Sequence, residues 1–232
     1  MQTTISKPAL AVRPVTAISL AVARLSLVCG ATFVVLLAVL HIARPDLDPS
    51  WRVISEYALG RFGWMMTIAF LALGSSAISL FVAIRSQVQD LLGKIGLAFL
   101  LLGATGPILA ALFTTDPITT PMDEISTNGM IHSTGAALSD GILIAATLLT
   151  LSLTRKNPNW SVARKPLILM TILAWVGAVA FTASMVILLP RNEGQLGPDV
   201  LIGWQGRLVM VAYAAWLMTA AWCAIQVRSR QA

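Results

Sequence analysis

Charged side chains are scarce in this sequence. Asp, Glu, Lys and Arg make up 11% of the 232 residues, whereas hydrophobic residues make up 57%. A soluble domain usually carries about a quarter charged residues. The scarcity therefore excludes an ordinary soluble domain. Because the apolar residues come in long blocks, the sequence predicts a polytopic membrane protein.

Cysteine and histidine are also rare, with two of each. Cys29 and Cys223 both lie inside apolar runs, which argues against a disulfide framework or a metal–thiolate site. The net charge is +6, but the basic residues form no cluster interleaved with aromatic residues, so nucleic acid is not an expected partner. The expected partner is the lipid bilayer, no cofactor is expected, and the sequence carries no signal for an oligomeric state.

Six apolar segments are long enough to cross a bilayer core of about 30 Å as helices. The first is too long for the apolar part of a signal peptide, and no small-x-small cleavage site ends it. The predicted fold class is therefore all-α, with one six-helix transmembrane domain over residues 17–227 between short tails at 1–16 and 228–232. The spans are expected at about 17–42, 62–84, 91–113, 129–153, 166–189 and 201–227.

Charge is distributed unevenly between the two sides of this topology. Most Lys and Arg residues fall on the side that holds both termini, whereas most Asp and Glu residues fall on the other side. Basic residues accumulate on the cytoplasmic side of membrane proteins. We therefore expect both termini, and both tails, to lie in the cytoplasm.

The segment from Gly129 to Gly141 opens the fourth span with small and polar residues. His132, Ser139 and Asp140 share one helical face with neighbours of small size, and such a face is expected to look into the protein. Asp140 lies ~16 Å along this segment, near the middle of the hydrocarbon layer. A carboxylate at that depth is costly unless it is protonated, paired or in contact with water.

Two interpretations of Asp140 remain open. The structural one pairs it with Arg24 of the first span, or has a protonated Asp140 bonded to serines or threonines of neighbouring helices. The functional one makes Asp140 a proton or cation site, or a contact for a ligand head group. A small proton- or ion-coupled transporter that works through Asp140 would follow from it.

A second group of polar residues is predicted at the outer face. The topology brings Glu56, Asp116, His132 and Arg207 to one layer, together with His41 at the end of the first span. Arg207 is suited to hold a phosphate or carboxylate with two hydrogen bonds. The alternative is that Arg207 only pairs with Asp116 or Glu56. This layer predicts a binding site for a lipid or a small ligand.

The same layer contains both histidines. His41, His132 and Asp116, with Glu56 nearby, have the donor types that bind a divalent metal such as zinc and leave a position open for water. Such a site would hydrolyse a lipid ester or amide. No HExxH or HxxxH spacing supports it. Whether the protein is an enzyme therefore stays open.

Several short motifs together resemble a known family, the domain of unknown function 998. The similarity extends from about residue 18 to 227, with Thr114 at a position where the family usually has proline. It implies a six-helix inner-membrane protein of prokaryotes with no assigned activity, and it supports Glu56, Asp116, His132 and Arg207 as motif positions. The motifs are Asp48-Pro49, Ile54-Ser55-Glu56-Tyr57-x-x-Gly60, Gly63-Trp64-Met65, Phe113-x-x-Asp116, Gly129-x-x-His132 and Gly206-Arg207.

Overall fold

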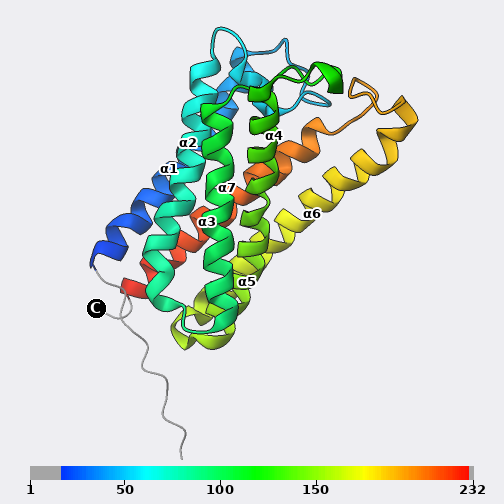
Figure 1. Ribbon diagram of the computed structural model, residues 1–232. Helices are drawn as coiled ribbons and strands as arrows, with labels where there is room; N and C mark the ends of the chain where they lie inside the picture. The colour runs from blue at the N-terminus through cyan, green and yellow to red at the C-terminus, as the bar shows by residue number, and fades with distance from the viewer. Residues whose placement is uncertain (1–16, 230–232) are drawn as a thin grey trace, which may run out of the picture.

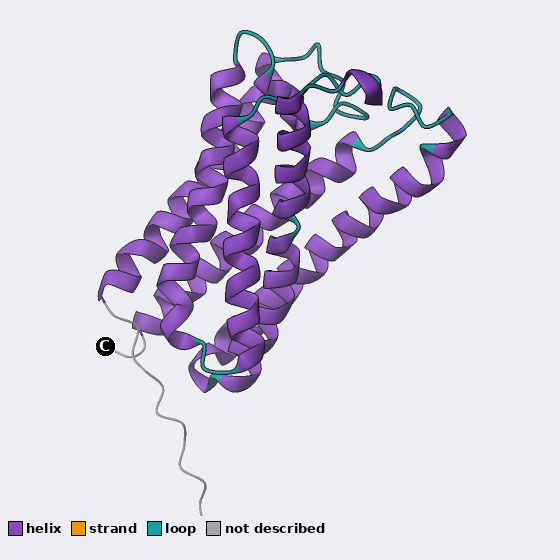
Figure 2. Ribbon diagram, in the orientation of Figure 1, coloured by secondary structure: helices purple, strands orange, loops and turns teal. Residues whose placement is uncertain are grey.

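The computed structural model describes residues 17–229, and all regular structure in that range is helical (Figures 1 and 2). Short 3-10 turns occupy parts of the connections between the main helices. The main helices are α1 (Ala17–Ala43), α2 (Gly63–Ile84), α3 (Leu91–Leu112), α4 (Thr127–Ser139), α5 (Gly141–Lys156), α6 (Arg164–Leu188) and α7 (Gly203–Ser229).

Six helical stretches among these residues are long and apolar enough to cross a membrane, as the sequence predicts. The protein is therefore a multi-pass membrane protein. The fourth stretch, Thr127–Arg155, is not a single helix, because α4 ends at Ser139 and α5 begins at Gly141. The expected tail at residues 1–16 and the last three residues of the chain lie outside the described range.

The two ends of the bundle differ in their connections. One end, called here the long-loop end, holds the connections 44–62, 113–126 and 189–202. The opposite end holds the short connections 85–90 and 157–163, together with the start of α1 and the end of α7 (Figure 1). Two of the long connections touch each other, since the Ile118 amide donates to the Glu56 carboxylate at 3.0 Å.

Small residues let α3 pack closely against the α4–α5 pair. A Cβ atom on Gly103 would lie 2.5 Å from the Ile142 nitrogen, and one on Gly106 would overlap the Gly135 carbonyl. His132, Gly135 and Ser139 are buried on this side of α4, so the small, polar face does look into the protein. Asp140 departs from that expectation and is exposed, because it lies about 100° around the helix from Ser139 at the break between α4 and α5.

The sixth span, α6, leans away from the rest of the bundle. It contacts α7, and it meets α5 where the Thr150 and Thr171 hydroxyls lie 3.1 Å apart and the Trp216 indole donates to Thr150. Toward the long-loop end α6 diverges from α4 (Figure 1). The other helices therefore leave most of the surface of α6 uncovered, and this surface faces the bilayer.

Candidate functional site

Arg207 is the centre of a polar cluster at the long-loop end. It lies in the second turn of α7, its side chain is 4% exposed, and its three nitrogens all donate hydrogen bonds. Nε donates to His41 Nε2 at 2.7 Å, and Nη2 donates to the Tyr57 hydroxyl at 3.2 Å. Nη1 donates to the carbonyl oxygens of Gly203, Arg52 and Pro49 at 3.0, 2.6 and 3.3 Å.

All of these acceptors are uncharged. The side-chain ion pairs within residues 17–229 are Arg44–Asp46 and Arg52–Glu56, each at 2.7 Å, and neither includes Arg207. These neutral acceptors satisfy most of the N–H donors of Arg207. However, no carboxylate among residues 17–229 is in contact with the guanidinium to neutralise its charge. A buried charge without an ion-pair partner costs free energy unless another group supplies the opposite charge.

His41 is held in one tautomer by its two partners. Its Nδ1 lies 2.7 Å from the Leu37 carbonyl oxygen, which only accepts, while its Nε2 faces a guanidinium N–H, which only donates. Nδ1 must therefore carry the proton and Nε2 must be bare. The imidazole is neutral in this arrangement, so it does not repel Arg207.

Two aromatic side chains enclose the pair. The Trp204 ring stacks on the His41 ring, with 6.3 Å between the ring centroids and 18° between the ring planes. The centroid of the Tyr57 ring lies 5.2 Å from that of His41, and the two rings are tilted to each other. The guanidinium carbon of Arg207 lies 5.6 Å from the Tyr57 ring and 5.8 Å from the Trp204 ring. Both rings lie within the range of cation–π attraction. Trp204 itself is 57% exposed and forms the outer lip of the cluster.

A groove of about 360 Å³ between α1 and α7 ends at this cluster. His41, Arg207 and Trp204 line its polar end, and the remaining lining residues are apolar. From His41 to Val34 the groove follows seven residues of α1, which is about 10 Å of helix. The apolar lining residues are Val34, Leu37, Ala38 and Val211. A polar end joined to an apolar trough suits an amphipathic molecule.

Glu56 is buried near this cluster and does not line the groove. Its side chain is 1% exposed, and Oε1 accepts from Arg52 Nη1 at 2.7 Å and from the Ile118 amide at 3.0 Å. Its Oε2 is buried with no hydrogen-bond partner among the described residues. Glu56 therefore joins the connection 44–62 to the connection 113–126, and it touches Arg207 only indirectly, through Arg52.

Asp116 and His132 bond to the backbone around them. Asp116 Oδ2 accepts from the Ser126 amide at 2.8 Å, and His132 Nδ1 donates to the Phe113 carbonyl at 2.8 Å. These bonds fix the start of α4 against the end of α3. The predicted layer thus divides: Arg207 and His41 line the groove, whereas Asp116 and His132 hold a loop. Arg207 contacts neither Asp116 nor Glu56, contrary to the alternative drawn from the sequence.

The residues suggested for a metal do not form a compact donor set. Within residues 17–229 no group of three or more His, Cys, Asp or Glu side chains is arranged to hold a metal ion. His41 is engaged with Arg207 and Leu37, and His132 with Phe113. The structure does not bring His41, His132 and Asp116 together.

Asp140 has a different partner from the one suggested by the sequence. Its Oδ1 accepts from the Tyr213 hydroxyl of α7 at 2.8 Å. Arg24 is exposed on α1 and forms no ion pair with Asp140 in the described structure. The suggested Arg24 pairing is wrong because α7, not α1, packs beside the break between α4 and α5.

A family model described as protein of unknown function (DUF998) matches residues 27–223. The chain belongs to this family. No curated protein and no solved structure matches the chain. Family membership thus confirms the resemblance seen in the sequence and assigns no activity.

Sequence reasoning missed both tyrosines. Tyr57 lies beside Glu56 in a polar segment and Tyr213 lies in an apolar run, and the sequence-based prediction included neither among the site residues. The chain has only two tyrosines, and each hydrogen-bonds to an ionisable side chain, Tyr57 to Arg207 and Tyr213 to Asp140. Their scarcity in a membrane chain was the available signal, since a phenol in the bilayer needs a polar partner.

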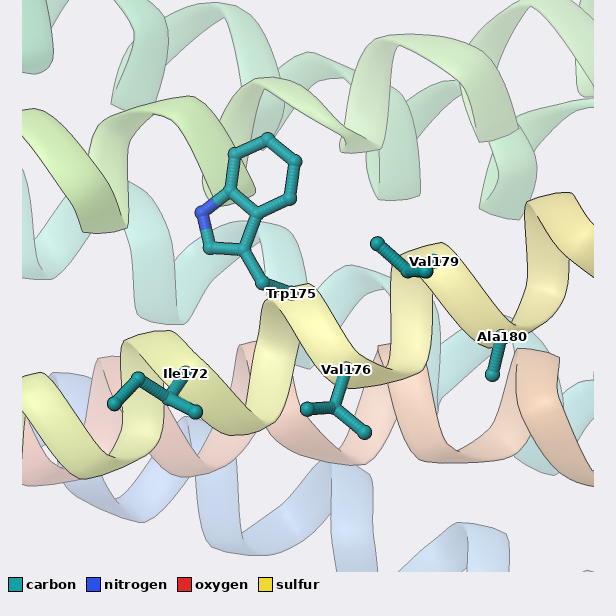
Figure 3. A pocket seen from close by; sticks show the side chains of 5 residues that line it. All are labelled: Ile172, Trp175, Val176, Val179 and Ala180. Atoms are coloured by element: carbon teal, nitrogen blue, oxygen red, sulfur yellow. The ribbon is translucent and has the colours of Figure 1, made fainter.

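A larger hollow of about 640 Å³ lies along α6 (Figure 3). Its lining residues are apolar, and Trp175 rises toward α5, where its indole nitrogen donates to Thr147 at 2.9 Å. No ionisable side chain lines this hollow. It is therefore a bilayer-facing surface, and the smaller groove at Arg207 is the better candidate site. The lining consists of Ile172, Trp175, Val176, Val179 and Ala180.

Charged groups in the connection 44–62 stabilise its conformation. The Arg44 guanidinium holds the pKa of the Asp46 carboxyl below its usual value, and Asp46 in turn raises the pKa of Arg44. The Ser50 amide, which donates to Asp48 at 2.9 Å, lowers the pKa of Asp48. Arg44 also donates to the Leu59 carbonyl. These contacts preorganise the loop that supplies Tyr57 and two of the carbonyls around Arg207.

Proposed function

We propose that this membrane protein binds an amphiphile with an anionic head, a phosphate or a carboxylate, in the groove between α1 and α7. The observation that carries the proposal is Arg207, a buried guanidinium that forms no ion pair with a carboxylate among residues 17–229 and lines the polar end of an apolar groove. An anionic head would supply the missing charge. Among residues 17–229 Nη2 has one acceptor, Tyr57, so one of its two N–H groups is left to donate to the head, and a hydrogen bond between charged groups is stronger than one between neutral groups.

The dimensions of the groove favour a single alkyl chain. Its apolar part follows about 10 Å of helix, and its walls are aliphatic. Because this part of α1 lies in a membrane-spanning stretch, the chain would gain close packing against these walls and not release from water. Trp204 at the lip offers an indole that prefers the boundary between apolar and polar regions. The head would then lie at the long-loop end and the chain would run toward the middle of the bundle.

We also propose that the long-loop end faces away from the cytoplasm, in the inner membrane of a prokaryote with both termini inside. The distribution of basic residues supports this orientation. To test it, Met122→Cys at the long-loop end and Gln89→Cys at the opposite end are each made in a variant without Cys29 and Cys223. A membrane-impermeant thiol reagent applied to intact cells is expected to label only the first. Labelling of only the second would reverse the orientation.

Binding is tested with the purified full chain in detergent. The probe is a fluorescent monoalkyl phosphate, and a monoalkyl trimethylammonium compound with the same chain is the charge control. The phosphate is expected to bind and the ammonium compound to bind at least about tenfold more weakly, a difference of about 1.4 kcal/mol. Equal binding of both probes would contradict recognition of the head by Arg207.

Two pairs of variants separate the head from the chain. Ala38→Phe fills the groove without touching the Arg207 contacts, and Ala21→Phe adds the same volume at another exposed position of α1. Arg207→Gln removes the buried charge, and Arg191→Gln removes an exposed charge from the connection 189–202. Ala38→Phe and Arg207→Gln are expected to weaken binding of the phosphate, and the two controls are not. Unchanged binding to a folded Ala38→Phe variant would reject the groove as the site.

A further inference from the structure

Asp140 lies at the centre of a membrane-spanning stretch and yet is exposed. It follows Thr127 by 13 residues and precedes Arg155 by 15, so along the helix axis it is about 20 Å from either end. The backbone changes there from α4 to α5. An ionisable side chain at this depth indicates a functional site, because the bilayer opposes its charged form.

Asp140 is exposed on the side of the α4–α5 pair that faces α6. Asp140 belongs to a stripe on α4 and α5 with Ser133, Ala137, Ile144 and Thr147, at steps of three and four residues. At one end of this stripe Thr147 accepts a hydrogen bond from Trp175 of α6. Beyond that contact α6 separates from α4 toward the long-loop end (Figure 1). Asp140 is thus open to the bilayer on the side toward α6.

The only hydrogen bond that the Asp140 carboxyl accepts within residues 17–229 comes from the Tyr213 hydroxyl. The charged and titratable groups of the packed elements are distant along their helices. Lys94 of α3 precedes Gly103, which packs against Gly141, by nine residues, and Arg207 precedes Tyr213 by six. The others on α7 are Cys223 and Arg228, 10 and 15 residues beyond Tyr213. His132 of α4 precedes Asp140 by eight residues, and Arg155 and Lys156 of α5 follow it by at least 15. Arg164 and Lys165 of α6 precede Trp175, which bonds to Thr147, by at least ten residues. Among the ion pairs of residues 17–229, none includes the Asp140 carboxyl.

We propose that Asp140 is a proton-binding site open to the bilayer, a carboxylic acid at neutral pH that exchanges its proton independently of the groove at Arg207. One carboxyl oxygen carries the proton, and the other accepts from Tyr213. A protonated carboxyl needs no counter-ion, which fits an exposed position at mid-membrane with no cation in contact. The chemical class of the ligand is the proton, and the site goes beyond the binding of an amphiphile.

The test uses dicyclohexylcarbodiimide, an apolar reagent that reaches carboxylic acids from the bilayer side. The acid proton moves to a carbodiimide nitrogen as a carboxyl oxygen bonds to the central carbon, and an acyl shift then gives a stable N-acylurea with no leaving group. The full chain in liposomes is treated over a range of pH, digested, and mapped by mass spectrometry. Asp140 is expected to be labelled at pH 7, and Asp140→Asn is expected to lose that label.

A second variant, Tyr213→Phe, tests the proposal even if Asp140→Asn fails to fold. In Tyr213→Phe the hydroxyl that donates to Asp140 is absent, and such a bond favours the ionised carboxylate. The pH at which labelling is half complete should therefore rise in Tyr213→Phe, and above it labelling should fall about tenfold per pH unit. The Asp116 carboxyl lies in the connection 113–126, outside the membrane-spanning stretches, and serves as the internal control that the apolar reagent should not label.

Three outcomes would overturn the proposal. Labelling of Asp140 only near or below pH 4, the usual range of an aspartic acid, would mean that it is ionised at neutral pH. Absence of labelling in liposomes at any pH, with labelling of the denatured chain, would mean that the carboxyl is not open to the bilayer. Protection by sodium at constant pH would replace the proton site by a cation site. None of these outcomes bears on binding at Arg207.

Discussion

Arg207 and His41 are 166 residues apart in the sequence, and their Nε and Nε2 atoms are joined by a hydrogen bond of 2.7 Å. The bond ties the start of α7 to the end of α1. It also requires a neutral imidazole, because a protonated His41 would turn its acceptor into a second donor facing a guanidinium. The pair therefore fixes both the shape of the groove and the charge at its polar end.

The first prediction concerns this pair. Arg207→Lys and His41→Phe should each lower the free energy of unfolding by about 1.5–3 kcal/mol, because a hydrogen bond to a charged group is lost. The double variant should cost less than the sum of the two by about 1 kcal/mol or more, since both changes remove the same contact. Thermal unfolding in detergent measures these values, with Arg191→Lys as the control. Strict additivity would show that the two side chains are not coupled.

The second prediction concerns the link between two connections at the long-loop end. Glu56→Ala removes the acceptor of the Ile118 amide, so hydrogen exchange at that amide should accelerate by about tenfold to a hundredfold. Glu56→Gln keeps an oxygen in place and should accelerate it less. The Leu59 amide donates to the backbone carbonyl of residue 56 and serves as the internal control. Equal acceleration at both amides in Glu56→Ala would indicate general loosening of the loop instead.

The third prediction concerns the close contact of α3 with α5. Gly103→Ala would put a Cβ atom 2.5 Å from the Ile142 nitrogen, so the helices must move apart. The expected loss of stability is about 1–3 kcal/mol. Gly197→Ala is the matched control, since the nearest atom to its Cβ is 3.8 Å away. A Gly103→Ala variant as stable as Gly197→Ala would contradict the observed packing.

The fourth prediction is a pH dependence in the connection 44–62. The pKa of Asp46 is lowered in the folded protein by Arg44, so its contribution to stability is complete above the ordinary aspartate pKa of about 3.9 and is lost as the pH falls through the lower folded value. Hydrogen exchange at the Leu47 amide, corrected for its intrinsic rate, should therefore rise in acid. In Asp46→Asn the exchange should already be fast at neutral pH. A wild-type loop that is insensitive to acid while the variant is loosened would contradict the electrostatic origin.

The length and apolarity of the spans and the small face of the fourth span could be predicted from the sequence. These properties depend on residues near one another in the chain, through helical periodicity and the thickness of the bilayer. The same reasoning correctly put Arg207 and His41 at one end of the molecule. It failed on the break at Asp140, because a single turn of altered hydrogen bonding leaves no mark in a pattern of apolar residues.

The order and tilt of the helices decided which side chains meet. The sequence suggested Arg24 as the partner of Asp140. It also suggested Asp116 or Glu56 as the partner of Arg207, since opposite charges attract. The fold instead supplied Tyr213, 73 residues from Asp140, and gave Arg207 an imidazole, a phenol and backbone carbonyls. These contacts join segments far apart in the chain, so no local pattern encodes them. The sequence by itself determined a six-span bundle with polar residues at one end and one acid at its centre. Only the tertiary packing decided that the arginine has no carboxylate in contact among residues 17–229 and that the acid is exposed and bonded to Tyr213.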